Sequence, residues 1–260
     1  MPRANRHYIP GYVWHITHRC HKKEFLLKFG RDKETWIQWL FEAKKRYGLS
    51  VLNYMVTSNH IHLLVADGRD RETIPKSIQL IAGRSGQEYN RRKRRKGAFW
   101  EDRYHATAVE GGEHLAQCMV YIDMNMVRAG VVKHPREWRF CGYQEIQKQK
   151  ERYRIIDYRK LMALLDVNDP GRLQESWRGW VEEALRGGDH VREGKWSESI
   201  AVGSENFVET TKEFLGVRGR GRQVLGENGR YELREPGSSY GRDFGVENSL
   251  LSHQNSYFWN

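Results

Sequence analysis

Two short stretches, far apart in the chain, carry the side chains with the most distinctive chemistry. The first is Ser58-Asn59-His60-Ile61-His62-Leu63-Leu64-Val65 and the second is Tyr121-Ile122-Asp123-Met124-Asn125. In a strand, His60 and His62 point to the same face; in a helix, Tyr121 and Asn125 lie one turn apart on the same stripe. Two imidazoles and a carboxamide oxygen can hold one divalent metal ion. The two stretches therefore predict a metal site with a tyrosine hydroxyl beside it.

Each stretch also has a plainer interpretation. A histidine-apolar-histidine triplet alone is typical of a strand with two surface histidines. Tyr121 alone is typical of a residue that packs with its hydroxyl at the edge of the core. The surroundings favour the site, because an apolar strand, Leu49–Val56, directly precedes the histidines and Thr57-Ser58-Asn59 suits a turn between two strands.

The elements that must position these side chains can be read from apolar periodicity and from turn residues. Up to Glu110 the pattern predicts strands and helices in the order β-α-β-β-α-β, which is the ferredoxin-like arrangement. Their predicted ranges are Gly11–Cys20, Asp32–Tyr47, Leu49–Val56, His60–Ala66, Thr73 to about Arg92, and Phe99–Glu110. A third helix, Glu113–Arg128, carries Tyr121 and is closed by Gly130. The fold class predicted is α+β, an antiparallel-sheet domain followed by the tyrosine-bearing helix.

The pattern changes after a return segment at 131–150, so we predict one domain over 1–150 and an extension over 151–260. The extension is expected to be mostly helical, with helices at Asp157–Leu165, Arg172–Arg186 and Ser204–Leu215. Its last thirty or so residues are expected to be loop-like. The terminal Tyr257-Phe258-Trp259 is too apolar for a free tail, and we expect it to dock on the body of the protein.

Charge points to the class of partner. The chain of 260 residues has a formal net charge of +11, which favours a polyanionic partner such as nucleic acid. Arg91-Arg92-Lys93-Arg94-Arg95-Lys96 is a run of consecutive cations, and this clustering argues against a merely solvated basic surface. With 38% hydrophobic residues the chain can still build a core.

Cysteine usage and hydropathy indicate the compartment. The 3 cysteines, Cys20, Cys118 and Cys141, are scattered and odd in number, so a disulfide framework is not expected and a reducing cytoplasm fits. The chain shows no signal-peptide pattern and no apolar run approaching ~20 residues. We therefore expect a cytoplasmic protein without a membrane partner.

Taken together, these motifs resemble the HUH endonuclease superfamily, which is named for histidine-hydrophobic-histidine. Within it the chain looks most like the single-tyrosine transposases of insertion sequences and their relatives, the REP-associated tyrosine transposases. The resemblance covers roughly residues 1 to 145, and Met126 stands where many relatives have proline. The matching segments are Trp14-His15-Ile16-Thr17-His18-Arg19, Asn59-His60-Ile61-His62, Phe99-Trp100-Glu101-Asp102-Arg103-Tyr104 and Tyr121-Ile122-Asp123-Met124-Asn125-Met126-Val127-Arg128-Ala129-Gly130.

The resemblance implies a role for four residues of the histidine and tyrosine stretches. His60 and His62 would be metal ligands with Asn125 as the third, the ion would be Mg²⁺ or Mn²⁺, and Tyr121 would be the nucleophile. The reaction implied is cleavage of single-stranded DNA through a 5′-phosphotyrosine link, which rejoining reverses. The implied ligand is a hairpin with a single-stranded flank, such as a REP-like palindrome, bound by a monomer or a homodimer.

Contacts to DNA are expected mainly from basic and aromatic side chains. The run Arg91–Lys96 and Arg103 would follow the phosphate backbone, and Tyr104 would stack on unpaired bases. Two other functions stay open: a protein that binds DNA hairpins without cutting, and a metal-dependent phosphodiesterase that uses water and leaves Tyr121 a structural role. A covalent adduct, cleavage without an adduct, or a mobility shift alone separates the three.

Overall fold

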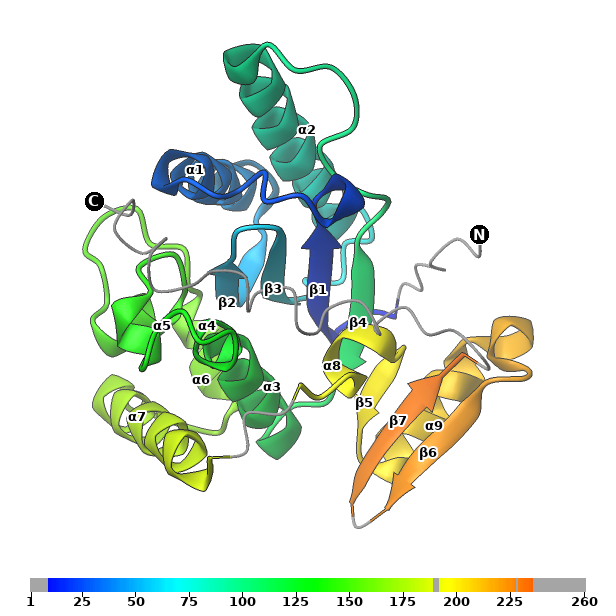
Figure 1. Ribbon diagram of the computed structural model, residues 1–260. Helices are drawn as coiled ribbons and strands as arrows, with labels where there is room; N and C mark the ends of the chain where they lie inside the picture. Colours follow the sequence, from blue (N-terminus) through cyan, green and yellow to red (C-terminus); the bar gives the residue numbers. More distant parts are fainter. Residues whose placement is uncertain (1–8, 189–191, 228, 236–260) are drawn as a thin grey trace.

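The computed structural model describes residues 9–188, 192–227 and 229–235 (Figure 1). At its centre lie four antiparallel strands in the order β2-β3-β1-β4. Their bounds are β1 (Val13–Arg19), β2 (Ser50–Val56), β3 (His60–Ala66) and β4 (His105–Val109). With one helix after β1 and one after β3, this is the ferredoxin-like arrangement, so the predicted α+β class is confirmed.

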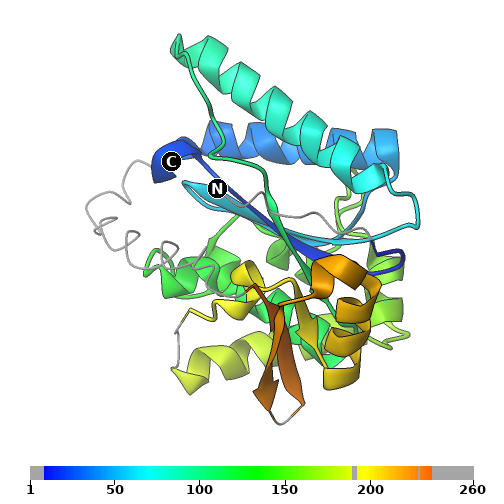
Figure 2. The same ribbon diagram turned by 90° about the vertical axis from the view of Figure 1, so that its right-hand side faces the viewer.

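Two long helices, α1 (Gly30–Tyr47) and α2 (Thr73–Lys93), cover one face of this sheet (Figure 2). Their apolar stripes are buried, as are the strand residues whose side chains point to that face. Gly48 ends α1 in the left-handed conformation, with φ of 69°, and its N–H donates to the Lys44 carbonyl. The buried residues of this layer include Ile16, Trp36, Leu40, Ile61, Leu63, Ile78 and Ile81.

Helices that follow β4 in the chain lie on the opposite side of the sheet (Figure 2). The tyrosine-bearing segment is not one helix over Glu113–Arg128, as predicted, but two: α3 (Glu113–Asp123) and α4 (Asn125–Arg128). Met124, with ψ of −3°, separates them, although its N–H still donates to the Val120 carbonyl at 2.9 Å. The remaining helices on this side are α5 (Tyr143–Gln147), α6 (Tyr158–Leu164), α7 (Pro170–Gly187) and α8 (Lys195–Glu198).

The predicted strand Phe99–Glu110 is too long. Only His105–Val109 forms β4, because the charged residues before it leave the sheet and run across its end. Trp100 retains a single bridge to Cys20, and its indole N–H donates to the Ala82 carbonyl of α2 at 3.0 Å. The Phe99-Tyr104 motif is therefore a loop packed on helix α2.

Beyond residue 150 the predicted helices are present, but the chain also forms strands that were not predicted. Strand β5 (Ala201–Gly203) pairs in parallel with β4, and the hairpin β6 (Gln223–Glu227) and β7 (Arg230–Arg234) continues the same sheet. Helix α9 (Glu205–Phe214) follows β5. The predicted docking of Tyr257-Phe258-Trp259 lies outside the described residues, and the division at residue 150 stays a prediction. Short 3₁₀ helices span His21–Lys23, Pro135–Glu137 and Gly216–Gly219.

A buried carboxyl group ties helix α3 to strand β2 and to helix α7. The Asp123 oxygens accept hydrogen bonds from Asn53 Nδ2 at 3.0 Å and from Trp177 Nε1 at 3.1 Å. Burial raises the pKa of Asp123 to about 7, and the two hydrogen bonds act in the opposite direction. Within the described residues, no helix has the length and apolar character that a membrane crossing requires.

Candidate active site

The pairing of β1 with β3 places the histidine motif on the face that α3 covers. Thr17 lies opposite His62 and Arg19 lies opposite His60, so the side chains at 15, 17 and 19 share a face with both histidines. His15, His60 and His62 are all buried, with exposed fractions of 0%, 5% and 1%. The sheet therefore gathers three imidazoles beneath a helix.

The three predicted ligands meet at this point. His60 Nε2 lies 3.1 Å from His62 Nε2, and Asn125 Nδ2 lies 3.0 Å from the same His62 nitrogen. Asn125 reaches this point because α4 begins at that residue, directly after the break at Met124. We call His60, His62 and Asn125 the trio. The structure brings together the ligand set that the sequence predicted, and their role as ligands remains a proposal.

Hydrogen bonds fix the orientation of the His60 ring. Its Nδ1 lies 2.7 Å from Asn59 Oδ1 and 3.0 Å from Thr57 Oγ1, and the Thr57 hydroxyl proton is directed to the His60 carbonyl at 2.8 Å. Both neighbouring oxygens therefore accept, and Nδ1 carries the proton. The lone pair of His60 then lies on Nε2, the nitrogen that faces His62.

The histidines of this face are neutral at ordinary pH. Burial lowers the pKa of His15 and of His60 to about 3, and it lowers the pKa of His62 well below its usual value. Neighbouring positive charges add to the effect on His60, from Arg19, Arg192 and Arg128 in that order. Neutral imidazole is the form that coordinates a metal ion.

The trio fits a divalent ion. Ligands at about 2.1 Å from an octahedral ion and a right angle apart lie about 3.0 Å from each other, close to the separation of the two Nε2 atoms. Asn125 Oδ1 is buried and has no hydrogen-bond partner among the described residues. A half-turn of the carboxamide exchanges Nδ2 and Oδ1 and brings that oxygen to the imidazoles. The described residues contain no group of three His, Cys, Asp or Glu side chains with metal-site geometry, so the fit depends on Asn125.

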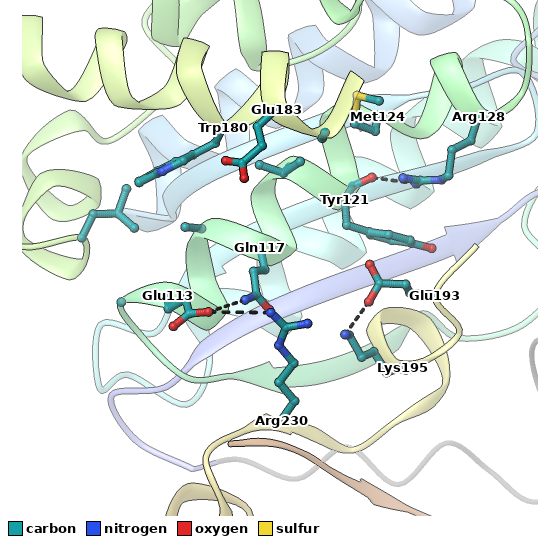
Figure 3. A pocket seen from close by; sticks show the side chains of 15 residues that line it. Glu113, Gln117, Tyr121, Met124, Arg128, Trp180, Glu183, Glu193, Lys195 and Arg230 are labelled. Carbon is teal, nitrogen blue, oxygen red and sulfur yellow. Dashed lines mark hydrogen bonds and ion pairs between the residues drawn. The ribbon is translucent and has the colours of Figure 1, made fainter. Parts of the chain in front are cut away.

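Tyr121 lies beside the trio on helix α3. Its ring centroid is 6.0 Å from that of His62, and its exposed fraction is 5%. The Arg128 guanidinium lies 4.2 Å from the Tyr121 ring centroid, and its Nη2 donates to the Tyr121 carbonyl at 2.7 Å. Figure 3 shows the Tyr121 ring between Arg128 and Glu193. The candidate nucleophile is held next to a buried cation.

Three guanidinium groups act electrostatically on His60, those of Arg19, Arg128 and Arg192, and the last two also act on His62. They come from β1, from α4 and from the segment before α8, and their convergence was not predicted. Arg19 and Arg128 do fall within the quoted motifs, but Arg192 had no signal in the sequence. Two of these arginines are already paired with carboxylates, Arg19 with Glu101 and Arg192 with Glu198 at 3.0 Å. A phosphate group would compete with those carboxylates for the guanidinium groups.

A cavity of about 750 Å³ is lined by Tyr121 but by none of the trio (Figure 3). It is bounded by α3, α7 and the segment 193–195, and Arg230 of β7 lies at its rim. Its lining combines apolar and charged groups, among them Val120, Trp180, Glu183, Glu193 and Lys195. Residues of the C-terminal extension thus form much of the wall next to the candidate nucleophile.

The predicted DNA-binding run Arg91–Lys96 lies at the end of α2. Two of its members are engaged within the protein: Arg92 forms an ion pair with Asp32, and Arg95 donates to the Ala98 carbonyl at 2.8 Å. The other four are exposed at the surface: Arg91, Lys93, Arg94 and Lys96.

The loop after this run connects it with the histidine site. Glu101 N–H donates to the Arg19 carbonyl at 2.9 Å, and the two side chains form an ion pair. Because Arg19 lies opposite His60, the basic run and the trio occupy the same end of the sheet. Arg103 is exposed there, whereas Tyr104 is buried, with its ring edge-on to His18 at 6.4 Å. Stacking of Tyr104 on a base stays a prediction. It would require the buried Tyr104 ring to move to the surface.

Comparisons with known proteins give one family. Residues 9–125, a little under half of the chain, match the model of the IS200-like transposases. No curated protein matches the sequence. A solved REP-associated tyrosine transposase bound to a REP hairpin is 18% identical, with a TM-score of 0.47, over 57% of this chain and 87% of that one. A candidate transposase from Deinococcus radiodurans R1 is 19% identical, with a TM-score of 0.33, over 46% of this chain and 95% of that one.

Acid should destabilise the metal-free protein. A histidine with a lowered pKa is neutral when folded and protonated when unfolded, so its contribution is complete above about pH 6.5 and is lost as pH falls toward 3. His15, with a pKa of about 3, should contribute a slope of about 1.4 kcal/mol per pH unit inside that window. Urea unfolding in EDTA at several pH values between 4 and 6 measures it. His15→Phe should flatten the curve by that amount, and an unchanged slope would show that His15 is charged in the fold.

The exposed part of the basic run should set the salt dependence of DNA binding. Replacing Arg91, Arg94 and Lys96 by glutamine should reduce the log–log slope of affinity against salt by about 0.7 per lost contact on a single strand. Fluorescence anisotropy with a labelled hairpin over a salt series measures this slope. The matched control changes three exposed cations near α6, Arg152, Arg159 and Lys160, and should leave the slope unchanged. Equal slopes for both triple variants would place the DNA elsewhere.

Proposed function

Because residues 9–125 of this chain match the model of the IS200-like transposases, we propose that the protein is a metal-dependent endonuclease and transposase that cuts and rejoins single-stranded DNA. The observation that carries the proposal is the meeting of two imidazole Nε2 atoms and Asn125 beside Tyr121, from segments far apart in the chain. Transposase activity is the class that the family supports. The tyrosine nucleophile and the ligand roles are the finer part of the proposal.

The proposed chemical step transfers one phosphodiester bond. The Tyr121 oxygen attacks phosphorus, the bond between phosphorus and the 3′ oxygen breaks, and the phenol proton passes to solvent while the 3′ oxygen leaves as a hydroxyl. The product is a 5′-phosphotyrosine ester with a free 3′-hydroxyl, so attack by another 3′-hydroxyl can rejoin the strand. One ester replaces another, and no external energy source is needed.

The residues of this chain divide the work between them. His60, His62 and Asn125 would hold a divalent ion, which we propose is Mg²⁺ or Mn²⁺, and such an ion would polarise the phosphate. The guanidinium groups near the pair, from Arg19, Arg128 and Arg192, bind and orient the phosphate and offset its charge in the transition state. Tyr121 on α3 and Asn125 at the start of α4 stand on either side of the break at Met124, so the short connection between the two helices sets the distance from nucleophile to ligand.

DNA in single-stranded or hairpin form is the partner we propose. Support comes from the family, from the net charge of +11 and from the exposed cations at the end of α2. A REP-like palindrome, the in vivo ion, and action as a monomer or a homodimer belong to the same proposal.

Removal of either histidine ligand should stop cleavage and spare binding. His60→Ala or His62→Ala should lower the rate of hairpin cleavage in Mn²⁺ by at least about 100-fold, the range for loss of one electrostatic stabiliser. DNA affinity should stay within about twofold, because phosphate contacts elsewhere supply it. His134→Ala is the matched control, because that ring bonds Glu182 and the Arg136 N–H and none of the contacts described at the trio. Cleavage by either ligand variant at the rate of the control would refute the site.

Tyr121→Phe tests the nucleophile directly. The variant removes one oxygen and keeps the ring against Arg128, so the fold, Mn²⁺ binding and hairpin binding should all persist. After incubation with labelled DNA and denaturation, the wild type should show a covalent adduct and the variant none. Tyr143→Phe, which removes the same atom from buried helix α5, should form the adduct normally.

The adduct also separates the remaining alternatives. Cleavage by the Tyr121→Phe variant without an adduct would favour a hydrolase that uses water, and a mobility shift alone from the wild type would favour a binding protein. Digestion of the wild-type adduct and mass spectrometry should find the DNA on the peptide that contains Tyr121. A link to any other tyrosine would overturn the assignment.

A further inference from the structure

One buried histidine of the sheet, His15, is not part of the trio and still contacts it. Its Nε2 lies 2.9 Å from His62 Nδ1, and its Nδ1 lies 2.7 Å from the carbonyl oxygen of Trp196. The His15 and His62 rings are stacked, with centroids 5.1 Å apart and planes inclined by 13°. His15 thus links a candidate ligand to the backbone of the C-terminal extension.

The donor and acceptor of each hydrogen bond in the series Trp196–His15–His62 follow from the Trp196 carbonyl at one end of the series. A carbonyl oxygen only accepts, so His15 Nδ1 donates to Trp196. A neutral His15 then accepts at Nε2, and the proton between the two rings belongs to His62 Nδ1. With its proton on Nδ1, His62 presents a lone pair at Nε2, which is the atom that faces His60 and Asn125.

The alternative tautomer would disable the site. If His62 carried its proton on Nε2, that nitrogen would be a donor and could not bind a metal ion. The outer nitrogen of a ligating histidine is commonly held by such a hydrogen bond, which fixes the tautomer and the ring orientation. In this protein the His15 imidazole holds the outer nitrogen of His62, and the Trp196 carbonyl in turn holds His15.

We infer that His15 is a positioning residue that sets the tautomer of His62 for metal binding, and that the Trp196 carbonyl of the C-terminal extension sets the tautomer of His15. The inference rests on the proposed function in naming a metal ion as the ligand of the trio. Its structural part, the proton positions, holds for the metal-free protein as well.

The Trp196 carbonyl is itself held firmly. The indole of Trp196 is fully buried, and its ring centroid is 6.2 Å from that of Tyr121. Three residues later the Ser199 carbonyl accepts from Thr107 Oγ1 at 2.7 Å and from His105 Nε2 at 3.0 Å. Helix α8 is therefore fastened to strand β4, and its carbonyl meets His15 at a fixed place. This anchor lies outside residues 9–125, the segment that matches the family.

Metal affinity tests the role of His15 without an activity assay. His15→Phe keeps a ring of similar size and removes both nitrogens, so Mn²⁺ binding to the DNA-free protein, measured by calorimetry or by the EPR signal of free Mn²⁺, should weaken 10- to 100-fold, the usual cost of losing such a partner. His15→Gln can place a carboxamide oxygen to accept from His62 Nδ1 and should recover much of that loss. An affinity for His15→Phe equal to the wild type would overturn the inference.

His18→Phe is the matched control. His18 lies on the same strand, is also buried and also bonds a backbone carbonyl, that of Asp102 at 2.8 Å, but its side chain is on the opposite face. It should leave Mn²⁺ affinity unchanged. Thermal melting of all three variants establishes that each is folded before affinities are compared.

The tautomer can be read directly in the metal-free protein. Long-range ¹H–¹⁵N correlation spectra of the histidine rings should show a protonated Nδ1 and an unprotonated Nε2 for His62, and His15→Phe should move the His62 proton toward Nε2. A wild-type His62 protonated at Nε2 would overturn the inference whatever the protein does with DNA. A wild type with the expected tautomers that binds no Mn²⁺ would instead count against the proposed function.

Discussion

The register between β1 and β3 is the constraint on which the candidate site depends. Because side chains alternate along a strand, a slip of one residue would turn His60 and His62 toward α1 and α2 and replace them with Ile61 and Leu63. The register is held by burial on both faces, since Ile61 and Leu63 pack against α1 and α2 while Leu64 and Ala66 are buried on the face that carries the histidines. The same packing that stabilises the sheet therefore aims two imidazoles at helix α3.

Burial of these imidazoles determines their chemistry. Desolvation keeps His15, His60 and His62 neutral, and the guanidinium groups that act on the pair make protonation still less favourable. The guanidinium groups would also weaken metal binding, because they would repel a divalent ion that enters the trio. A phosphate group removes that repulsion, as it attracts both the ion and the arginines. The electrostatics of the proposed site would therefore favour binding of metal and DNA together over binding of metal alone.

The sequence was informative where pattern and local geometry coincide. The apolar run Leu49–Val56 and the turn at Thr57-Ser58-Asn59 located the histidine hairpin, and helical spacing put Tyr121 and Asn125 on one side. The break at Met124 was missed because it keeps the helical direction and changes only one ψ angle. Strands β5 to β7 were missed because they are short, three to five residues long. Arg192 and the Trp196 carbonyl have no local signature, since only tertiary packing brings them to the site.

The C-terminal extension is part of the structure that surrounds the trio. Helix α7 donates from Trp177 to Asp123, two residues from each of Tyr121 and Asn125, and the carbonyl of Trp196 on α8 reaches His15. Both contacts act on buried polar groups, which would otherwise lose their partners at a cost of about 1–3 kcal/mol each. Strand β5 extends the central sheet at β4, so the extension is joined to the frame that carries the histidines. Residues that match the family carry the candidate reactive groups, and residues beyond them, Trp177 and Trp196, make hydrogen bonds to the buried groups next to those candidates.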